Sequence, residues 1–284
     1  MSSPVLCSTV TPDFPPLVYD GNSGGKKRTG YERYMYSLYD DRLWDDEDIP
    51  DGILKIYFFN GSEEQKNFVF DTAREWLSEV DNNRDKIVEE YSQYKEFSKI
   101  KDCILHLKFE RIEESDEAHI RIKFVDDRCW SAVGRAALSL DKQNATMYLC
   151  LHNDSDPERQ LAWRRYMVLH LFGHALGLTH EFQHHGLYVL EQDQVCKCRG
   201  MNEEFVRREL IQKYGSTYMH LANEVDLDPD TVMIYPFATN WIEEKQRKMV
   251  WEDYPLRYTL DTLPPQKLSL SDLFWTLKKY SLSK

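Results

Sequence analysis

The stretch of sequence that decides the fold is His170-Leu171-Phe172-Gly173-His174-Ala175-Leu176-Gly177-Leu178-Thr179-His180. Two imidazoles four residues apart lie on one face of an α-helix, as a tetrahedral zinc ion requires. Gly177 accepts a left-handed backbone conformation, so the chain is able to leave the helix sharply and return towards that face. His180 follows three residues later. We therefore predict that His170, His174 and His180 hold one Zn²⁺ ion.

These eleven residues resemble a known zinc signature. Their histidines and Gly177 stand at the positions of H-E-x-x-H-x-x-G-x-x-H, the signature of the metzincin metallopeptidases. Only the glutamate is missing, and Leu171 stands in its place. The resemblance is to the astacin-like branch of fungal and bacterial type. It implies that Glu181, directly after the third histidine, serves as a structural anchor rather than as a catalyst.

A second segment resembles the methionine turn of the same family. It is Thr231-Val232-Met233-Ile234-Tyr235-Pro236. The resemblance implies that Met233 forms a hydrophobic base under the imidazoles. It also implies that the Tyr235 phenol points towards the metal, as a hydrogen-bond donor or oxyanion stabiliser.

The resemblance extends over roughly residues 50 to 284. The segments that carry it outside the site are 118–124, 130–134, 146–149 and 268–272. It implies the α+β zincin-like fold of the metzincins, with a mixed sheet and a zinc-binding helix above a loop-rich C-terminal subdomain that holds the Met-turn.

Three parts of the chain are expected from composition and from this resemblance. Residues 1–28 are rich in Ser, Pro and Gly, so they bury too little apolar surface to fold alone and form a flexible tail. Residues 29–181 form the N-terminal subdomain with the zinc helix. Residues 182–284 form the C-terminal subdomain.

Hydrophobic periodicity predicts the individual elements. Strands are expected over 53–59, 104–109, 119–124 and 146–151. Helices are expected over 63–80, from Pro157 to a stop at Gly177, over 203–214 and over 271–280.

Composition narrows the possible partners. The chain has 284 residues and a formal net charge of -12, which disfavours nucleic acid and anionic membranes. No secretory signal begins the sequence and no apolar run is long enough to span a bilayer, so we expect a cytoplasmic protein. In that reducing compartment the six cysteines are expected to be thiols, with Cys196 and Cys198 in a loop.

Leu171 is expected to impair peptide hydrolysis and to leave metal binding intact. In an active zinc peptidase the carboxylate at this position takes a proton from the metal-bound water and passes it to the leaving amine. Leucine can do neither, and loss of a general base typically lowers the rate by about 10²–10⁴-fold. Glu181, His184 and His185 are weak substitutes, whereas three neutral imidazoles still bind metal.

The sequence leaves three functions open, and the retained Tyr235 favours the first of them. The first is a repurposed enzyme in which zinc acts as a Lewis acid on a small-molecule or peptide-like substrate in the zinc cleft, assisted by Tyr235. The second is a pseudopeptidase that binds a peptide along the strand at 146–151, which is expected at an edge of the sheet, while zinc braces the fold. The third is a residual endopeptidase that uses another base.

Overall fold

The structure is a computed structural model of the chain. It describes residues 7–8, 43–91, 102–151, 153–181, 228, 230–234 and 262–283. The predicted helix over 203–214, the two loop cysteines and the division between subdomains near residue 181 depend on residues outside these ranges, so they stay predictions. So does the tail, in which only residues 7–8 are described.

A six-stranded mixed sheet is the framework of the described chain. Its strands in spatial order are β1 (Cys7–Ser8), β6 (Cys129–Ser131), β7 (Met147–Leu149), β5 (Ile120–Phe124), β2 (Ile53–Phe58) and β4 (Lys108–Arg111). Every neighbouring pair is parallel except β6 and β7, which are antiparallel. In β2, alternate residues are buried, so one face of this strand belongs to the core.

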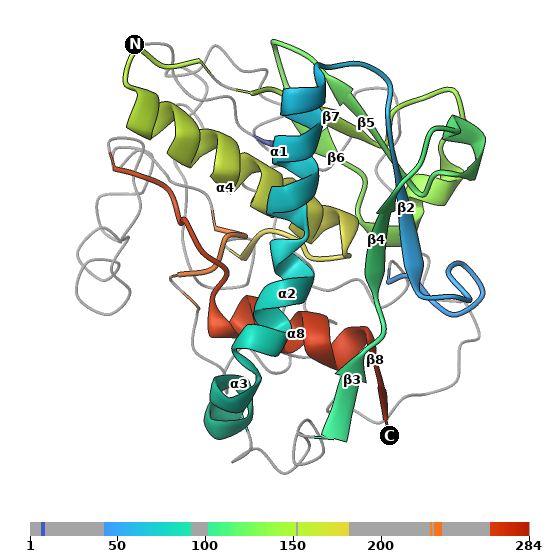
Figure 1. The fold of residues 1–284 in the computed structure, drawn as a ribbon, viewed down its shortest axis with the longest axis vertical. Helices are drawn as coiled ribbons and strands as arrows, with labels where there is room; N and C mark the ends of the chain where they lie inside the picture. Colours follow the sequence, from blue (N-terminus) through green and yellow to red (C-terminus); the bar gives the residue numbers. More distant parts are fainter. Residues whose placement is uncertain are drawn as a thin grey trace, which may run out of the picture.

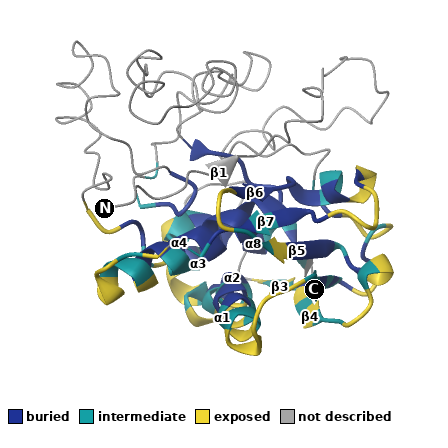
Figure 2. Ribbon diagram, turned by 90° about the horizontal axis from the view of Figure 1, so that it is seen from above, coloured by how far each residue is buried: buried dark blue, intermediate teal, exposed yellow. Residues whose placement is uncertain are grey.

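The described chain contains five α-helices. They are α1 (Glu63–Ala73), α2 (Glu75–Asn82), α3 (Arg84–Tyr91), α4 (Pro157–Ala175) and α8 (Leu270–Lys279). Of these, α4 contacts β6 and β7 of the sheet. In Figure 1, α1 crosses α4 and α2 crosses α8, and both pairs are in contact. A small antiparallel sheet of β3 (Cys103–Leu105) and β8 (Ser281–Ser283) lies beside α8. Figure 2 shows the buried residues gathered in the sheet and in the helices packed on it.

The C-terminal half of α4 is the centre of the core. Its residues from Tyr166 to Ala175 are all buried. Three large side chains from other elements donate hydrogen bonds to its carbonyl groups. The bonds are Trp76 Nε1 to Leu169 O (3.0 Å), Trp44 Nε1 to Ala175 O (2.8 Å) and Tyr280 Oη to Leu176 O (2.8 Å). The helix is therefore held in place from several directions before any metal is considered.

Most of the predicted helices and strands that fall on described residues are present. Their boundaries differ from the predicted ones where contacts between distant segments decide them. The expected helix over 63–80 is wrong as a single helix, because the chain breaks at Arg74 into α1 and α2. The expected strand over 104–109 is also two strands, since β3 pairs with β8 and β4 pairs with β2. Hydrophobic periodicity reports the buried face, but it does not report which partner each segment finds.

The predicted position of strand 146–151 at an edge of the sheet is wrong. Its core, β7, has β6 on one side and β5 on the other. Both sets of its backbone groups are thus used within the sheet. A peptide cannot add to β7 as a further strand.

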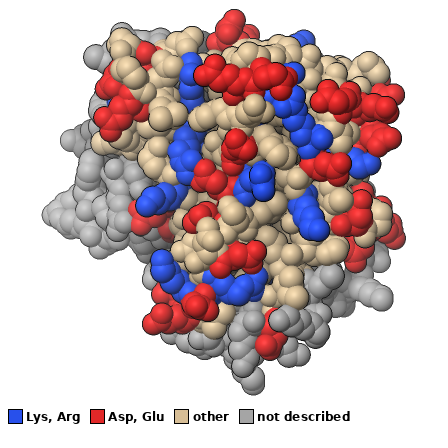
Figure 3. Space-filling view, in the orientation of Figure 1, with Lys and Arg blue, Asp and Glu red and all other residues tan. Residues whose placement is uncertain are grey.

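Charged side chains of both signs are interspersed on the face shown in Figure 3. Among the described helices, none combines the length and the apolar character that a membrane crossing requires.

Candidate metal centre

Local sequence sets where α4 begins and ends. The carboxylate of Asp156 accepts hydrogen bonds from the backbone N–H groups of Glu158 and Arg159, and Pro157 occupies the first turn. At the other end Gly177 has φ of 92°, a left-handed conformation. The N–H of Gly177 donates to His174 O (2.8 Å) and that of Leu178 donates to Gly173 O (2.9 Å). This pair of bonds is a Schellman motif, which reverses the chain after the helix.

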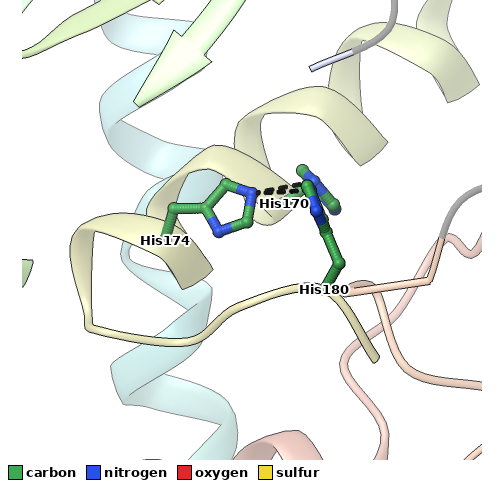
Figure 4. A group of neighbouring side chains, drawn as sticks. All are labelled: His170, His174 and His180. Atoms are coloured by element: carbon green, nitrogen blue, oxygen red, sulfur yellow. Dashed lines mark hydrogen bonds between the residues drawn. The ribbon is translucent and has the colours of Figure 1, made fainter. Parts of the chain in front are cut away.

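The reversal brings three imidazoles together. His170 and His174 lie one turn apart on α4, and His180 reaches them from the segment after Gly177 (Figure 4). The Nε2 atom of His174 is 3.1 Å from the Nε2 atoms of both His170 and His180. Nitrogens bound to one tetrahedral zinc ion at about 2.0–2.1 Å are roughly 3.4 Å apart. The observed spacing is close to that value, and all three side chains are fully buried.

Backbone carbonyl groups fix the tautomers of two of the rings. His170 Nδ1 lies 2.7 Å from Val232 O, and His174 Nδ1 lies 2.8 Å from Leu178 O. A carbonyl oxygen only accepts, so each Nδ1 carries the hydrogen and each Nε2 presents a lone pair. The two lone pairs therefore face each other across 3.1 Å.

Protonation does not relieve this repulsion at neutral pH. Burial lowers the pKa of His170 to about 4. Burial and the neighbouring charge of His170 lower the pKa of His174. A positively charged group that accepts electron pairs is what the site needs, and the donor set of three imidazoles suits Zn²⁺. Among the described residues this is the only group of three or more His, Cys, Asp or Glu side chains with metal-binding spacing.

The segment 231–234 lies against α4 and packs under the zinc helix. A Cβ atom added to Gly173 would lie 2.3 Å from Met233 Sδ and 3.1 Å from a ring carbon of Trp76. Met233 is fully buried at this contact. Glycine between the two helical histidines therefore lets the methionine approach the helix backbone.

Tyr166 is a residue of this site that the sequence reasoning missed. Its hydroxyl donates to Ile234 O (2.7 Å) and lies 3.5 Å from His170 Nδ1. Tyr166 precedes His170 by four residues and so shares its helix face, which is the signal that would have identified it.

Of the other predicted site residues, the structure describes some and not others. Leu171 is fully buried and belongs to the hydrophobic core. Its hydrocarbon side chain offers no proton acceptor beside the metal ligands. Tyr235, His184 and His185 lie outside the described residues.

Glu181 is buried beside other acids. Its backbone N–H donates to Met233 O (3.1 Å), and its Oε2 atom has no hydrogen-bond partner. Burial, and then the charges of Asp228 and Asp272, raise the pKa of Glu181 well above its usual value. Burial and the charge of Asp228 also raise the pKa of Asp272 to about 7. Burial thus disfavours the charged form of Glu181, which is the form that a general base needs.

Known proteins resemble this chain in structure but not detectably in sequence. No protein-family model matches, and no curated protein matches. One structure of myroilysin matches with a TM-score of 0.58 and 19% identity, covering 86% of this chain and 97% of that chain. A second structure of myroilysin matches with a TM-score of 0.51 and 19% identity, covering 85% and 86%.

A third match is high choriolytic enzyme 1, a hatching enzyme zinc-protease from Oryzias latipes (Medaka fish). Its TM-score is 0.43 at 12% identity, with 86% of this chain and 96% of that chain covered. The myroilysin structures show the fold. The described chain has the α+β fold of the astacin-like metzincins, as the sequence resemblance implied.

The three imidazoles predict one zinc ion per chain. Protein loaded with zinc and then desalted should contain one equivalent of zinc by mass spectrometry, and His174→Ala should lose it because only two ligands remain. The matched control is His106→Ala, which removes an exposed histidine of the same chain. Zinc retained at one equivalent by His174→Ala would contradict this site.

The contact between Gly173 and Met233 predicts that replacing this helical glycine by alanine destabilises the protein, which is the opposite of the usual effect. Alanine is normally better than glycine in a helix interior by about 1 kcal/mol. Gly173→Ala should instead lower the free energy of unfolding by about 1–3 kcal/mol, since the new methyl group overlaps Met233 Sδ. Urea unfolding measures this loss, which should shrink in a Met233→Ala background. A stabilised Gly173→Ala protein would show that the close packing is wrong.

Proposed function

We propose that this chain is an astacin-like metzincin that binds zinc and no longer hydrolyses peptides efficiently. The observation that carries the proposal is the position of Leu171. It follows the first of three converging imidazoles, where the family signature has its general base. The ligands of the metal are kept and the group that moves the proton is not.

Neither Leu171 nor Glu181 is a ready replacement for the missing base. Leu171 has no titratable atom, and the raised pKa of Glu181 favours its neutral form. Zinc in such a site supplies Lewis-acid polarisation and an acidified water molecule. Without a carboxylate to carry the proton to the leaving amine, peptide cleavage would be slower by about 10²–10⁴-fold.

A bracing role for the metal has the strongest support. The three ligands and Leu171 are fully buried. The ligands also join separate parts of the chain, because His170 contacts the segment 231–234 and His180 lies beyond the end of α4. A metal that binds only the folded arrangement adds its binding free energy to folding. In this role the chain is a pseudopeptidase.

A Lewis-acid enzyme is the second candidate. It is favoured by the full burial of the three ligands, because electrostatic polarisation is stronger where water is excluded. Its substrate would be a small molecule or a peptide-like compound whose oxygen binds the metal without needing an activated water. Tyr235 would donate a hydrogen bond to that oxygen.

Restoring a carboxylate tests the proposal. Zinc-loaded wild-type protein should show no chelator-sensitive cleavage of casein, whereas Leu171→Glu should gain it, at a rate about 10²-fold or more above the wild-type background. Leu171→Gln is the matched control, because it has the same shape as Leu171→Glu and cannot accept the proton.

One result would contradict the proposal. Chelator-sensitive cleavage by wild-type protein at the rate of Leu171→Glu would show that another group serves as the base. The residual endopeptidase would then be the correct function.

A further inference from the structure

The last helix of the chain contacts the metal-centre turn through one buried carboxylate. Asp272 lies in the first turn of α8 and is fully buried. Its Oδ2 atom accepts hydrogen bonds from the N–H groups of Ser269 (3.0 Å) and Val232 (3.2 Å). The Ser269 hydroxyl in turn accepts from Asp272 N (3.0 Å), which completes a capping box. Asp272 thus belongs both to the helix cap and to the segment 231–234.

The second oxygen of Asp272 begins a chain of hydrogen bonds that ends at a metal ligand. Thr231 Oγ1 donates to Asp272 Oδ1 (2.7 Å) and accepts from Met233 N (3.0 Å). The same peptide group that contains Met233 N has Val232 O as its oxygen. Val232 O accepts from His170 Nδ1 at 2.7 Å. One hydroxyl and one peptide group therefore separate the carboxylate from the imidazole.

All donors in this chain point the same way. The order is His170 Nδ1–H to the carbonyl of Val232, the N–H of that peptide group to Thr231, and the hydroxyl of Thr231 to the carboxylate. Hydrogen bonds aligned head to tail polarise one another, more so where the dielectric is low. Three hydrogen bonds donated to the two oxygens of Asp272 favour its ionised form. When Asp272 is ionised, its negative charge at the acceptor end draws the Nδ1 proton and increases the electron density at Nε2. Metal-bound histidines commonly have a carboxylate or carbonyl partner with this effect.

The two metal ligands on α4 differ in which part of the chain accepts the hydrogen bond of their Nδ1–H group. His174 Nδ1 donates to Leu178 O, in the turn that ends α4. That contact fixes the ring by local backbone geometry alone. His170 instead depends on residues 231–233 and on α8, which are far from it in sequence.

We propose that Asp272 is a positioning residue of the metal centre, which acts on His170 through Thr231 and the Val232–Met233 peptide group. The inference rests on the proposed zinc site and adds a determinant of its affinity. It follows that docking of α8 and binding of metal support each other, because each holds the same turn in place.

Zinc affinity of the full-length chain, measured by competition with a chromogenic chelator, tests this inference. Asp272→Ala should bind zinc about 10–100-fold more weakly than wild type, as expected for loss of an outer partner of a ligand. Thr231→Val should weaken binding in the same range. Because both act through one chain of bonds, the double variant should bind no more weakly than about the weaker single variant.

Ser269→Ala is the matched control. It removes the hydroxyl that caps α8 and leaves the contacts of Asp272 with Thr231 and Val232. Its zinc affinity should stay within about threefold of wild type, although the cap loss costs about 1 kcal/mol of stability. An equal loss of affinity in Ser269→Ala and Asp272→Ala would overturn the inference, because general destabilisation of α8 would then explain both.

Asp272→Asn provides a second test should Asp272→Ala fail to fold. Its amide keeps the size of the side chain but lacks the charge and one of the two acceptors. In zinc-loaded protein the His170 Nδ1–H proton resonance should move upfield in Asp272→Asn and in Thr231→Val, since the hydrogen bond weakens. It should not move in Ser269→Ala.

The outcomes separate this inference from the proposed function. Failure of the wild-type chain to bind zinc would remove the proposed site itself. Tight binding by wild type, with Asp272→Ala or Asp272→Asn within threefold and the His170 resonance unmoved, would leave the zinc site intact and overturn only the role of Asp272.

Discussion

Three imidazole nitrogens converge in a fully buried site, and the Nε2 lone pairs of His170 and His174 repel each other unless a cation lies between them. Other parts of the described structure hold the three imidazoles in this arrangement. The Schellman motif at Gly177 returns the chain to the helix face. Carbonyl groups of Val232 and Leu178 fix the ring tautomers. The core contacts of Trp76, Trp44 and Tyr280 hold the helix that supplies two of the ligands.

Metal binding and peptide hydrolysis need different groups, and in the function proposed above this chain keeps only the first set. A site of three neutral imidazoles depends on geometry and tautomer, both of which are independent of residue 171. Hydrolysis also needs a group that exchanges a proton at that position. Leu171 joins the core instead, so it adds apolar packing where an active peptidase would have a buried charge.

Features encoded by short-range spacing were predictable from the sequence. The interval between His170 and His174, the glycine after the helix and the proline at its start each have a local physical reason, and α4 has the expected course. Features that depend on distant partners were not predictable. The break at Arg74 and the interior place of β7 follow from packing between elements. The link from Asp272 to His170 passes through the Thr231 hydroxyl and a backbone peptide group, and the peptide group has no signature in side-chain identity.

Thermal unfolding of zinc-loaded and metal-free protein tests most directly whether the buried triad needs its cation. Zinc that binds only the native state adds about 2.7 kcal/mol when free zinc is 100 times the dissociation constant. The metal-free protein should therefore melt several degrees lower and recover when zinc is restored. An unchanged melting temperature in protein verified to be metal-free would contradict a bracing role for zinc in this fold.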